Sequence, residues 1–180
     1  MNPFESAKVE LDSLLGIFFE DPSSLAGFTE VTADQIPEPF QALLNHDAHM
    51  TVTVEKYHSS QVDVQVLQTE KAGATYAREI LLCRQTDQQV VQYGIVRLNF
   101  DHLGKHVQQE IESQQVPLGR VLIDHDVMRQ VKLLSLYEVK PGPALVEALR
   151  IEAAATCFGR TAMIFCDDQP AIELLEIVTV

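Results

Sequence analysis

Residues 75–100 read TYAREILLCRQTDQQVVQYGIVRLNF, and they give the clearest indication of the fold. Two long runs, 75–85 and 88–100, are rich in aliphatic and aromatic residues, and the polar pair Thr86-Asp87 separates them. This pattern predicts two β-strands that form a hairpin. Strands joined by so short a turn are antiparallel, because a parallel pair needs a long crossover connection.

Segments on both sides of this hairpin extend the same sheet. Residues 62–66 alternate valine with polar side chains, and residues 49–57 contain a similar alternation of valine with threonine, which is typical of strands. The further predicted strands are residues 49–57 and 62–66, together with a second hairpin formed by residues 155–166 and 171–180, while residues 134–139 are a further candidate strand. The sheet should therefore contain about six antiparallel strands.

Other apolar side chains recur at helical spacing. A helix is predicted from the N-cap residue Asn2 to Phe18, with Leu11 and Leu14 on one face. Further helices are expected at residues 37–45, 101–114 and 144–154, with one or two short ones within 117–132, whereas residues 21–37 suggest an irregular connection. The expected fold class is α+β, an antiparallel sheet with helices packed on one face. We expect one domain over residues 1–180, of which residues 1–36 form an N-terminal helical extension.

The composition disfavours several kinds of partner. Hydrophobic residues make up 46% of the chain and charged residues 22%, which is ordinary for a globular protein, and the net charge is −13. Nucleic acids and anionic membrane surfaces attract basic faces, so neither is an expected partner. No apolar run is long enough for membrane insertion, and residues 1–10 lack the features of a secretory signal. These observations predict a cytoplasmic protein.

Cysteine and histidine residues give no sign of a metal site. Cys83, Cys157 and Cys166 lie in apolar stretches without a CxxC spacing, so we expect reduced core residues. His102 and His106 are spaced like metal ligands on the helix expected at 101–114, but without further ligands they are better explained as part of a solvated face.

Two charged residues occupy strand positions that should be apolar. Arg78 and Glu176 each share their side of a predicted strand with three bulky apolar side chains. A buried charge is unfavourable unless it is paired or serves a ligand. The two residues could pair with each other or with Glu79 and Arg160. Alternatively, Arg78 could grip a carboxylate while Glu176 accepts a hydrogen bond from a hydroxyl group.

Five short motifs, in this order along the chain, resemble motifs of the chorismate pyruvate-lyases. They are Leu43-Leu44 with Asp47 and Met50-Thr51, the strand Arg78–Cys83, the segment Pro117–Arg120 followed by residues 121–123, the triplet Phe158–Arg160, and the closing strand Leu174–Val178. The resemblance covers roughly residues 40–180 and implies a chorismate lyase-like fold.

The resemblance also implies a reaction: a lyase would remove pyruvate from chorismate and leave 4-hydroxybenzoate, or a closely related hydroxybenzoate, in a buried pocket. No metal or other cofactor takes part. In this reading Arg78 and Glu176 are the catalytic residues, since Arg78 holds the ring carboxylate and Glu176 orients the hydroxyl group. The residues expected to bind the substrate are Met50, Leu118 through its backbone amide, Arg97 and Arg160.

A non-catalytic sensor or carrier of small aromatic acids, on the same fold, is the alternative. Arg97 is displaced from the position of the second arginine that some members of the family carry, which favours this alternative. In both readings the partner is a small molecule, chorismate or a hydroxybenzoate. The sequence leaves the oligomeric state open.

Overall fold

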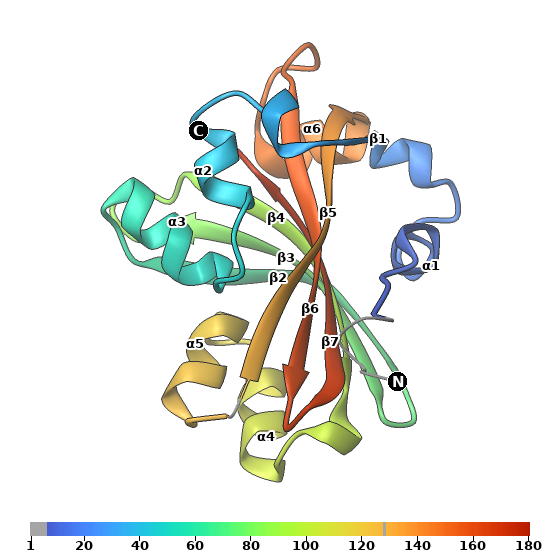
Figure 1. Cartoon of the computed structure of the whole chain (residues 1–180), viewed down its shortest axis with the longest axis vertical. Helices are drawn as coiled ribbons and strands as arrows, with labels where there is room; N and C mark the ends of the chain where they lie inside the picture. The colour runs from blue at the N-terminus through green and yellow to red at the C-terminus, as the bar shows by residue number, and fades with distance from the viewer. Residues whose placement is uncertain (1–6, 128) are drawn as a thin grey trace.

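A single seven-stranded antiparallel sheet organises the molecule (Figure 1). The structure is a computed structural model, and it describes residues 7–127 and 129–180. The strand order across the sheet is β1-β5-β6-β7-β4-β3-β2. The strands are β1 (Ala26–Val31), β2 (Val62–Ala72), β3 (Thr75–Arg84), β4 (Val90–Asn99), β5 (Arg129–Pro141), β6 (Cys157–Cys166) and β7 (Gln169–Val178).

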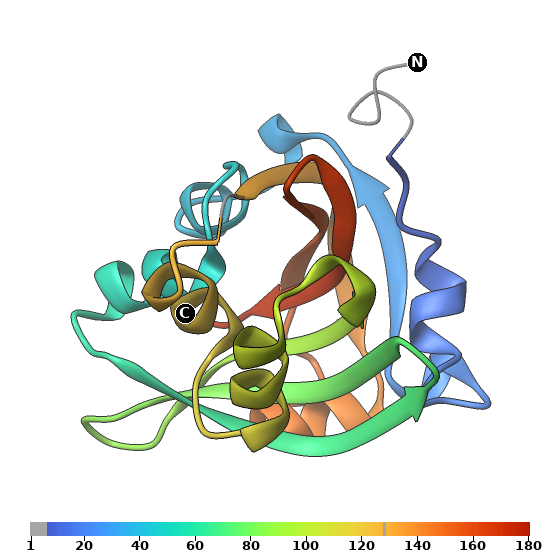
Figure 2. The same cartoon turned by 90° about the horizontal axis from the view of Figure 1, so that it is seen from below.

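Helices cover both faces of this sheet. They are α1 (Leu11–Leu15), α2 (Phe40–Leu44), α3 (Met50–His58), α4 (Lys105–Ser113), α5 (Leu118–Asp124) and α6 (Pro143–Leu149), with short 3₁₀ turns at Pro22–Ser24, Ala33–Gln35 and Phe100–His102. The sheet curls around α4 and α5, so that α2 to α5 lie on its concave side and α1 and α6 on the other (Figure 2).

Side-chain parity on β3 and β4 shows why the sheet has two helical layers. On β3, Ile80 and Leu82 pack against the concave layer, whereas Leu81 packs against α1 and α6. Nearly every residue of β3 and β4 is buried, as expected for central strands covered on both faces. Arg78, being even-numbered, therefore faces the concave side.

Both predicted hairpins are confirmed. In the first, β3 and β4 pair so that Arg78 lies opposite Val96; in the second, β6 and β7 pair so that Arg160 lies opposite Glu176. Asp167, at the tip of the second hairpin, has a positive φ of 49°, which aspartate tolerates in tight turns. The α+β class is thus confirmed, with a seventh strand and a second helical layer added.

One strand assignment made from sequence is wrong, and one strand was missed. Residues 49–57 were expected to form a strand, but most of them belong to α3, where Met50 and Val54 are buried one turn apart against the sheet. Packing of this apolar face outweighs the β-propensity of the valines and threonines. Within the expected irregular connection, β1 adds a strand at the sheet edge by pairing with β5. Only its first residue is fully buried, so its sequence carries no clear alternation.

The N-terminal helix is shorter than expected. It begins at Leu11 and ends at Leu15, and residues 7–10 are not helical. The start predicted at Asn2 lies outside the described residues. Because β1 pairs within the sheet, residues 1–36 are not purely a helical extension.

The three cysteines are free and buried, as expected. Burial raises the pKa of Cys157 and Cys166 to about 11, so neither thiol is ionised near neutrality. No helix among the described residues is long and apolar enough to cross a membrane.

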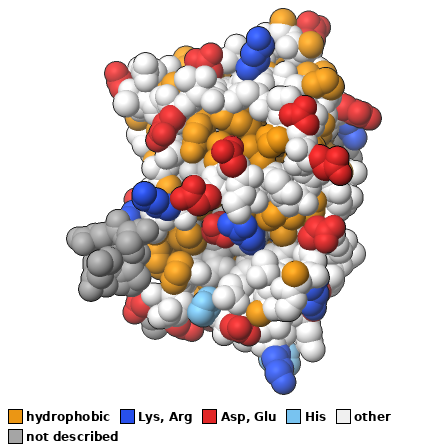
Figure 3. Space-filling view, turned by 90° about the vertical axis from the view of Figure 1, so that its right-hand side faces the viewer, with side chains coloured by type: hydrophobic (Ala, Val, Ile, Leu, Met, Phe, Trp, Pro, Cys, Tyr) orange, Lys and Arg blue, Asp and Glu red, His pale blue; other side chains and the backbone are white. Residues whose placement is uncertain are grey.

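Acidic side chains are scattered over the face that carries α1, with hydrophobic side chains exposed between them and few basic ones (Figure 3). The acidic side chains on this face are thus dispersed and not gathered in a single cluster, in a chain whose net charge is −13. An anionic ligand would have to be attracted by locally placed arginines.

Candidate functional site

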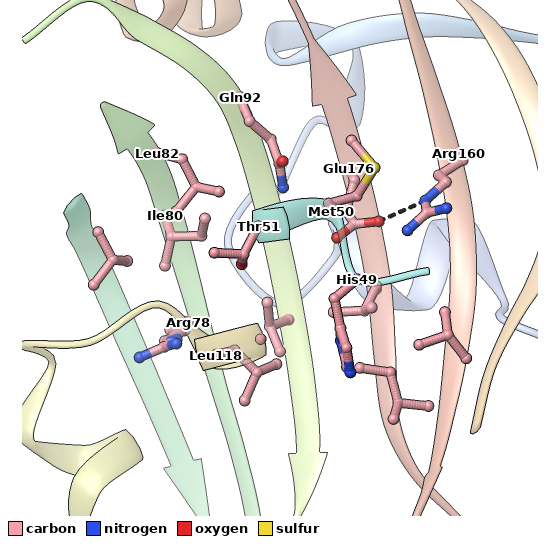
Figure 4. A pocket seen from close by; sticks show the side chains of 16 residues that line it. His49, Met50, Thr51, Arg78, Ile80, Leu82, Gln92, Leu118, Arg160 and Glu176 are labelled. Carbon is pink, nitrogen blue, oxygen red and sulfur yellow. Dashed lines mark hydrogen bonds and ion pairs between the residues drawn. The ribbon is translucent and has the colours of Figure 1, made fainter. Parts of the chain in front are cut away.

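A cavity lies between the concave face of the sheet and the helices α3 and α5 (Figure 4). The space not filled by atoms is about 470 Å³, including the opening onto solvent. Its apolar wall includes Met50, Ile80, Leu82, Val96, Leu118 and Leu174. Because part of this volume belongs to the opening onto solvent, only a compact ligand would fit.

Arg78 lies at one end of the cavity and lacks a carboxylate partner. Its side chain extends from β3, the residue is 1% exposed, and Nη1 donates to the backbone oxygen of Ile111 at 3.3 Å. That oxygen belongs to the last turn of α4, where the helix dipole favours a cation. Among the described residues no acidic side chain pairs with Arg78, and Nε has no hydrogen-bond partner. Burial lowers the pKa of this guanidinium.

Glu176 faces the other end of the cavity and is paired. Arg160, directly opposite on β6, donates from Nε to Glu176 Oε2 at 2.7 Å. From the strand spacing and register, the Cα atoms of Arg78 and Glu176 are about 12 Å apart, two strands across and two residues along. The cavity thus has a cationic end and an acceptor end.

Arg160 lines the cavity, but each of its three side-chain nitrogens already donates a hydrogen bond within the protein. Besides Glu176, it donates to the backbone oxygens of His46 at 2.7 Å and Ala48 at 3.0 Å. These bonds hold the segment between α2 and α3 against the sheet. These contacts give Arg160 a structural role, and its expected part in binding the ligand stays a prediction.

Met50 and Leu118 line the cavity as the first residues of α3 and α5. Close packing of the two helices fixes Leu118: a Cβ atom at Gly119 would come within 2.8 Å of Thr51 Oγ1. The N–H of Leu118 is at the start of its helix and has no partner within it. The structure thus brings Arg78, Glu176, Met50 and Leu118 to one cavity.

Arg97 does not line the cavity, which corrects its expected place in the site. It has the opposite parity to Val96 on β4 and lies on the outer face of the sheet. There it makes two hydrogen bonds to Glu173, at 2.5 and 2.8 Å, and one to Ser13 Oγ at 3.0 Å. Strand periodicity alone places Arg97 and Arg78 on opposite faces of the sheet. Arg78 lies opposite Val96, and Arg97 is the next residue along β4, so its side chain points the other way.

Two polar lining residues were missed from the sequence. Gln92 is 3% exposed, and no described residue donates a hydrogen bond to its Oε1. A single amide side chain within the apolar run of residues 90–96 was the available signal. His49 was missed because residues 49–57 were assigned to a strand. It accepts a hydrogen bond from Arg129 Nε at 2.7 Å, and burial, with help from Arg129 and Arg160, lowers its pKa to about 4.

His49 also marks the side on which the cavity approaches the surface. Together with Val131 it lines both the cavity and an open depression outside it, where Arg129 and Asp47 lie. The His49–Arg129 pair therefore stands between the cavity and solvent.

This arrangement is suited to holding an anion at one end and a hydrogen-bond donor at the other. The described residues contain no group of three or more histidine, cysteine or acidic side chains placed to hold a metal ion. The alternative of simple charge pairing applies to Glu176 only, because Glu79 accepts hydrogen bonds from Tyr93 and Gln68.

Comparison with known proteins identifies the fold. No protein-family model matches the chain, and no curated protein matches it. PhnF from Mycobacterium smegmatis is similar in structure, with a TM-score of 0.52 and 10% identity over 74% of this chain and 64% of PhnF. The effector domain of PhnF gives a TM-score of 0.51 and 12% identity, over 73% of this chain and 87% of that domain.

At this level of identity the likeness concerns the fold alone. The chain spans 64% of the PhnF chain and has the fold of the PhnF effector domain. The expected chorismate lyase-like architecture is confirmed, while no match identifies the chain as a chorismate pyruvate-lyase.

Proposed function

We propose that this chain is a ligand-binding domain, a sensor or carrier, that holds a small carboxylic acid in the cavity. Arg78 carries the proposal: it is 1% exposed, and no acidic side chain among the described residues pairs with it. A buried cation without a counter-ion is unfavourable, so the carboxylate of a ligand would supply the missing partner. A guanidinium suits this task because its planar fork can bind both carboxylate oxygens.

The size and lining of the cavity define the ligand further. The wall is largely aliphatic, and the free space is small. A compact acid with an apolar body, such as a benzoate, matches these features. The effector domain of PhnF shows that a protein of this fold serves as an effector domain elsewhere, which supports a binding role here.

Chorismate pyruvate-lyase activity is the less supported proposal. Chorismate carries two carboxylates, and Arg97, the expected second cation, lies on the outer face of the sheet. Arg160 is poorly suited to replace it, since each of its nitrogens already donates to Glu176 or to a backbone oxygen. Arg78 and Glu176 do line one cavity, so elimination of pyruvate from chorismate there is to be measured directly.

Calorimetric titration with 4-hydroxybenzoate tests the binding function. Replacing Arg78 with Ala should weaken binding by roughly 2 to 5 kcal/mol, the range for removing one partner of a buried charge pair. Arg78→Lys should recover only part of this loss. Arg97→Ala, an arginine change on the opposite face, is the matched control and should leave the affinity unchanged. Equal affinities of wild type and Arg78→Ala would refute the proposal.

Incubation with chorismate separates binder from enzyme. We expect no release of pyruvate above the spontaneous rate, although hydroxybenzoate binds. Turnover that depends on Arg78 would instead establish the lyase, and its sensitivity to Glu176→Gln would show whether Glu176 acts in the transition state.

A further inference from the structure

The amide of Gln92 is an unused polar group inside the cavity. Gln92 lies on β4 between Val91 and Tyr93, which are fully buried, and is itself 3% exposed. Its amide points into the space between Thr51 and Glu176 (Figure 4). No residue in the described part of the chain donates to its Oε1. Buried amide oxygens in proteins are nearly always hydrogen-bonded, so this atom needs a donor that the described residues do not supply.

Glu176 offers a second free oxygen at the same end. Its Oε2 accepts from Arg160, whereas its Oε1 accepts no hydrogen bond from any described residue. Glu176 pairs with Gly94 across the β4–β7 ladder, two residues from Gln92, so the two side chains are diagonal neighbours on one face. Gly94, between Gln92 and Val96 on that face, has no side chain that could donate to either oxygen.

The charges around the cavity limit the net charge of its ligand. Arg78 and Arg160 carry two positive charges and Glu176 carries one negative charge. His49 is neutral at pH 7, because its pKa is about 4. A ligand with one negative charge balances the remaining positive charge, whereas a zwitterion would leave it unbalanced.

We propose that Gln92 and Glu176 together select a monoanionic acid whose far end offers two hydrogen-bond donors. This inference rests on the proposed function, in which Arg78 holds the carboxylate. A neutral primary aromatic amine or a pair of adjacent hydroxyl groups has the required chemistry, since each presents two donors without adding charge. Gln92 is then the residue that distinguishes such acids from acids with one donor or none.

Calorimetry on the full chain at pH 7, with four benzoates, tests this selection. Benzoate has no donor opposite its carboxylate and 4-hydroxybenzoate has one, whereas 4-aminobenzoate and 3,4-dihydroxybenzoate each have two. At least one two-donor acid should bind about tenfold more tightly than 4-hydroxybenzoate, because it satisfies an otherwise unpaired buried acceptor. Comparison of the amine with the diol shows which source of donors the site takes.

Replacement of Gln92 by Leu should remove this preference. Affinity for benzoate should stay within about threefold of wild type, while the advantage of the two-donor acid should fall to about threefold or less. Gln65→Leu is the matched control: Gln65 is exposed on β2, and its replacement should leave the preference intact. Gln92→Met provides a second variant if Gln92→Leu does not fold.

The outcomes distinguish this inference from the function on which it rests. Equal affinities of wild type for all four acids, with binding lost in Arg78→Ala, would overturn the role of Gln92 and keep the carboxylate site. A preference that survives in folded Gln92→Leu would also overturn it. Absence of Arg78-dependent binding of every acid would overturn both proposals.

Discussion

Arg160 and Glu176 form a buried ion pair across β6 and β7, with 2.7 Å between Nε and Oε2. The Arg160 side chain is fully buried and that of Glu176 is 8% exposed. Arg78, equally buried on the same face of the sheet, has no such partner among the described residues. Two buried arginines thus have different consequences for stability and for ligand binding.

The Arg160–Glu176 pair should show strong coupling in urea denaturation. Glu176→Leu should lower the free energy of unfolding by roughly 3 to 5 kcal/mol, because it leaves Arg160 buried without a counter-ion. In the Arg160→Met background the same change should be much less destabilising. An equivalent cycle on the half-buried Arg97–Glu173 pair is the control, and its coupling should be about 1 kcal/mol or less. Additive effects at Arg160 and Glu176 would contradict the pairing.

Strand periodicity explains how much of the site the sequence could predict. Alternation placed Arg78 and Glu176 on an inward face, and the structure puts both at the cavity beside Leu118. The same rule applied to β4 points to Gln92 and excludes Arg97, although the motif resemblance suggested Arg97. Where a strand is central and regular, parity is reliable because a one-residue slip would expose a whole apolar face.

Features that depend on contacts distant in sequence could not be predicted. Residues 50–58 carry β-branched side chains, yet they form α3 because Val54 becomes buried when this helix packs against the sheet. The partner of Arg160 could not be chosen from sequence either: Glu176 and the backbone of residues 46 and 48 meet it only in the folded chain. The edge strand β1 was missed because a half-exposed strand needs little apolar sequence.

Gly119 should be required for the position of α5. A methyl group there would meet Thr51 Oγ1 at 2.8 Å and His49 Cβ at 3.3 Å, so Gly119→Ala should push α5 and Leu118 away from α3. We expect a loss of about 1 to 3 kcal/mol in stability, measured by urea denaturation, and weaker hydroxybenzoate binding. Gly27→Ala is the control, since its new Cβ would lie 3.9 Å from Lys140 Cβ, an ordinary contact. Equal free energies of unfolding for the two variants would show that α5 can move away from α3 without loss of stability.

His49 should make the fold less stable in mild acid. Its pKa is lowered to about 4, chiefly by burial and then by Arg129 and Arg160. The neutral form is therefore favoured in the folded state, and stability is complete above pH 6.5. It should be lost progressively as the pH falls from 6.5 towards 4, by at most about 3 kcal/mol from this residue.

His49→Gln isolates that contribution, because an amide oxygen can still accept from Arg129 but does not titrate. The free energy of unfolding of this variant should fall less steeply over the same pH range. His46 and His58 also have lowered pKa values and keep part of the slope in both proteins. Parallel pH profiles for wild type and His49→Gln would exclude His49 as a source of the acid sensitivity.

Arg78→Met should stabilise the ligand-free protein and abolish its response to ligand. Methionine fills much of the same space without placing an unpaired cation in the cavity, so we expect a gain of roughly 1 to 3 kcal/mol in urea denaturation. In wild type, hydroxybenzoate at a hundred times its Kd should add about 2.7 kcal/mol of stability, and at the same concentration it should add less than about 1 kcal/mol to Arg78→Met. Arg160→Met provides the comparison, since it should destabilise by removing the partner of Glu176 and three backbone contacts.

If Arg78→Met were as destabilising as Arg160→Met, Arg78 would be a structural residue, satisfied by the carbonyl of Ile111 and the end of α4. A gain in stability at the expense of binding would instead mean that the chain keeps an unfavourable charge for the sake of its ligand.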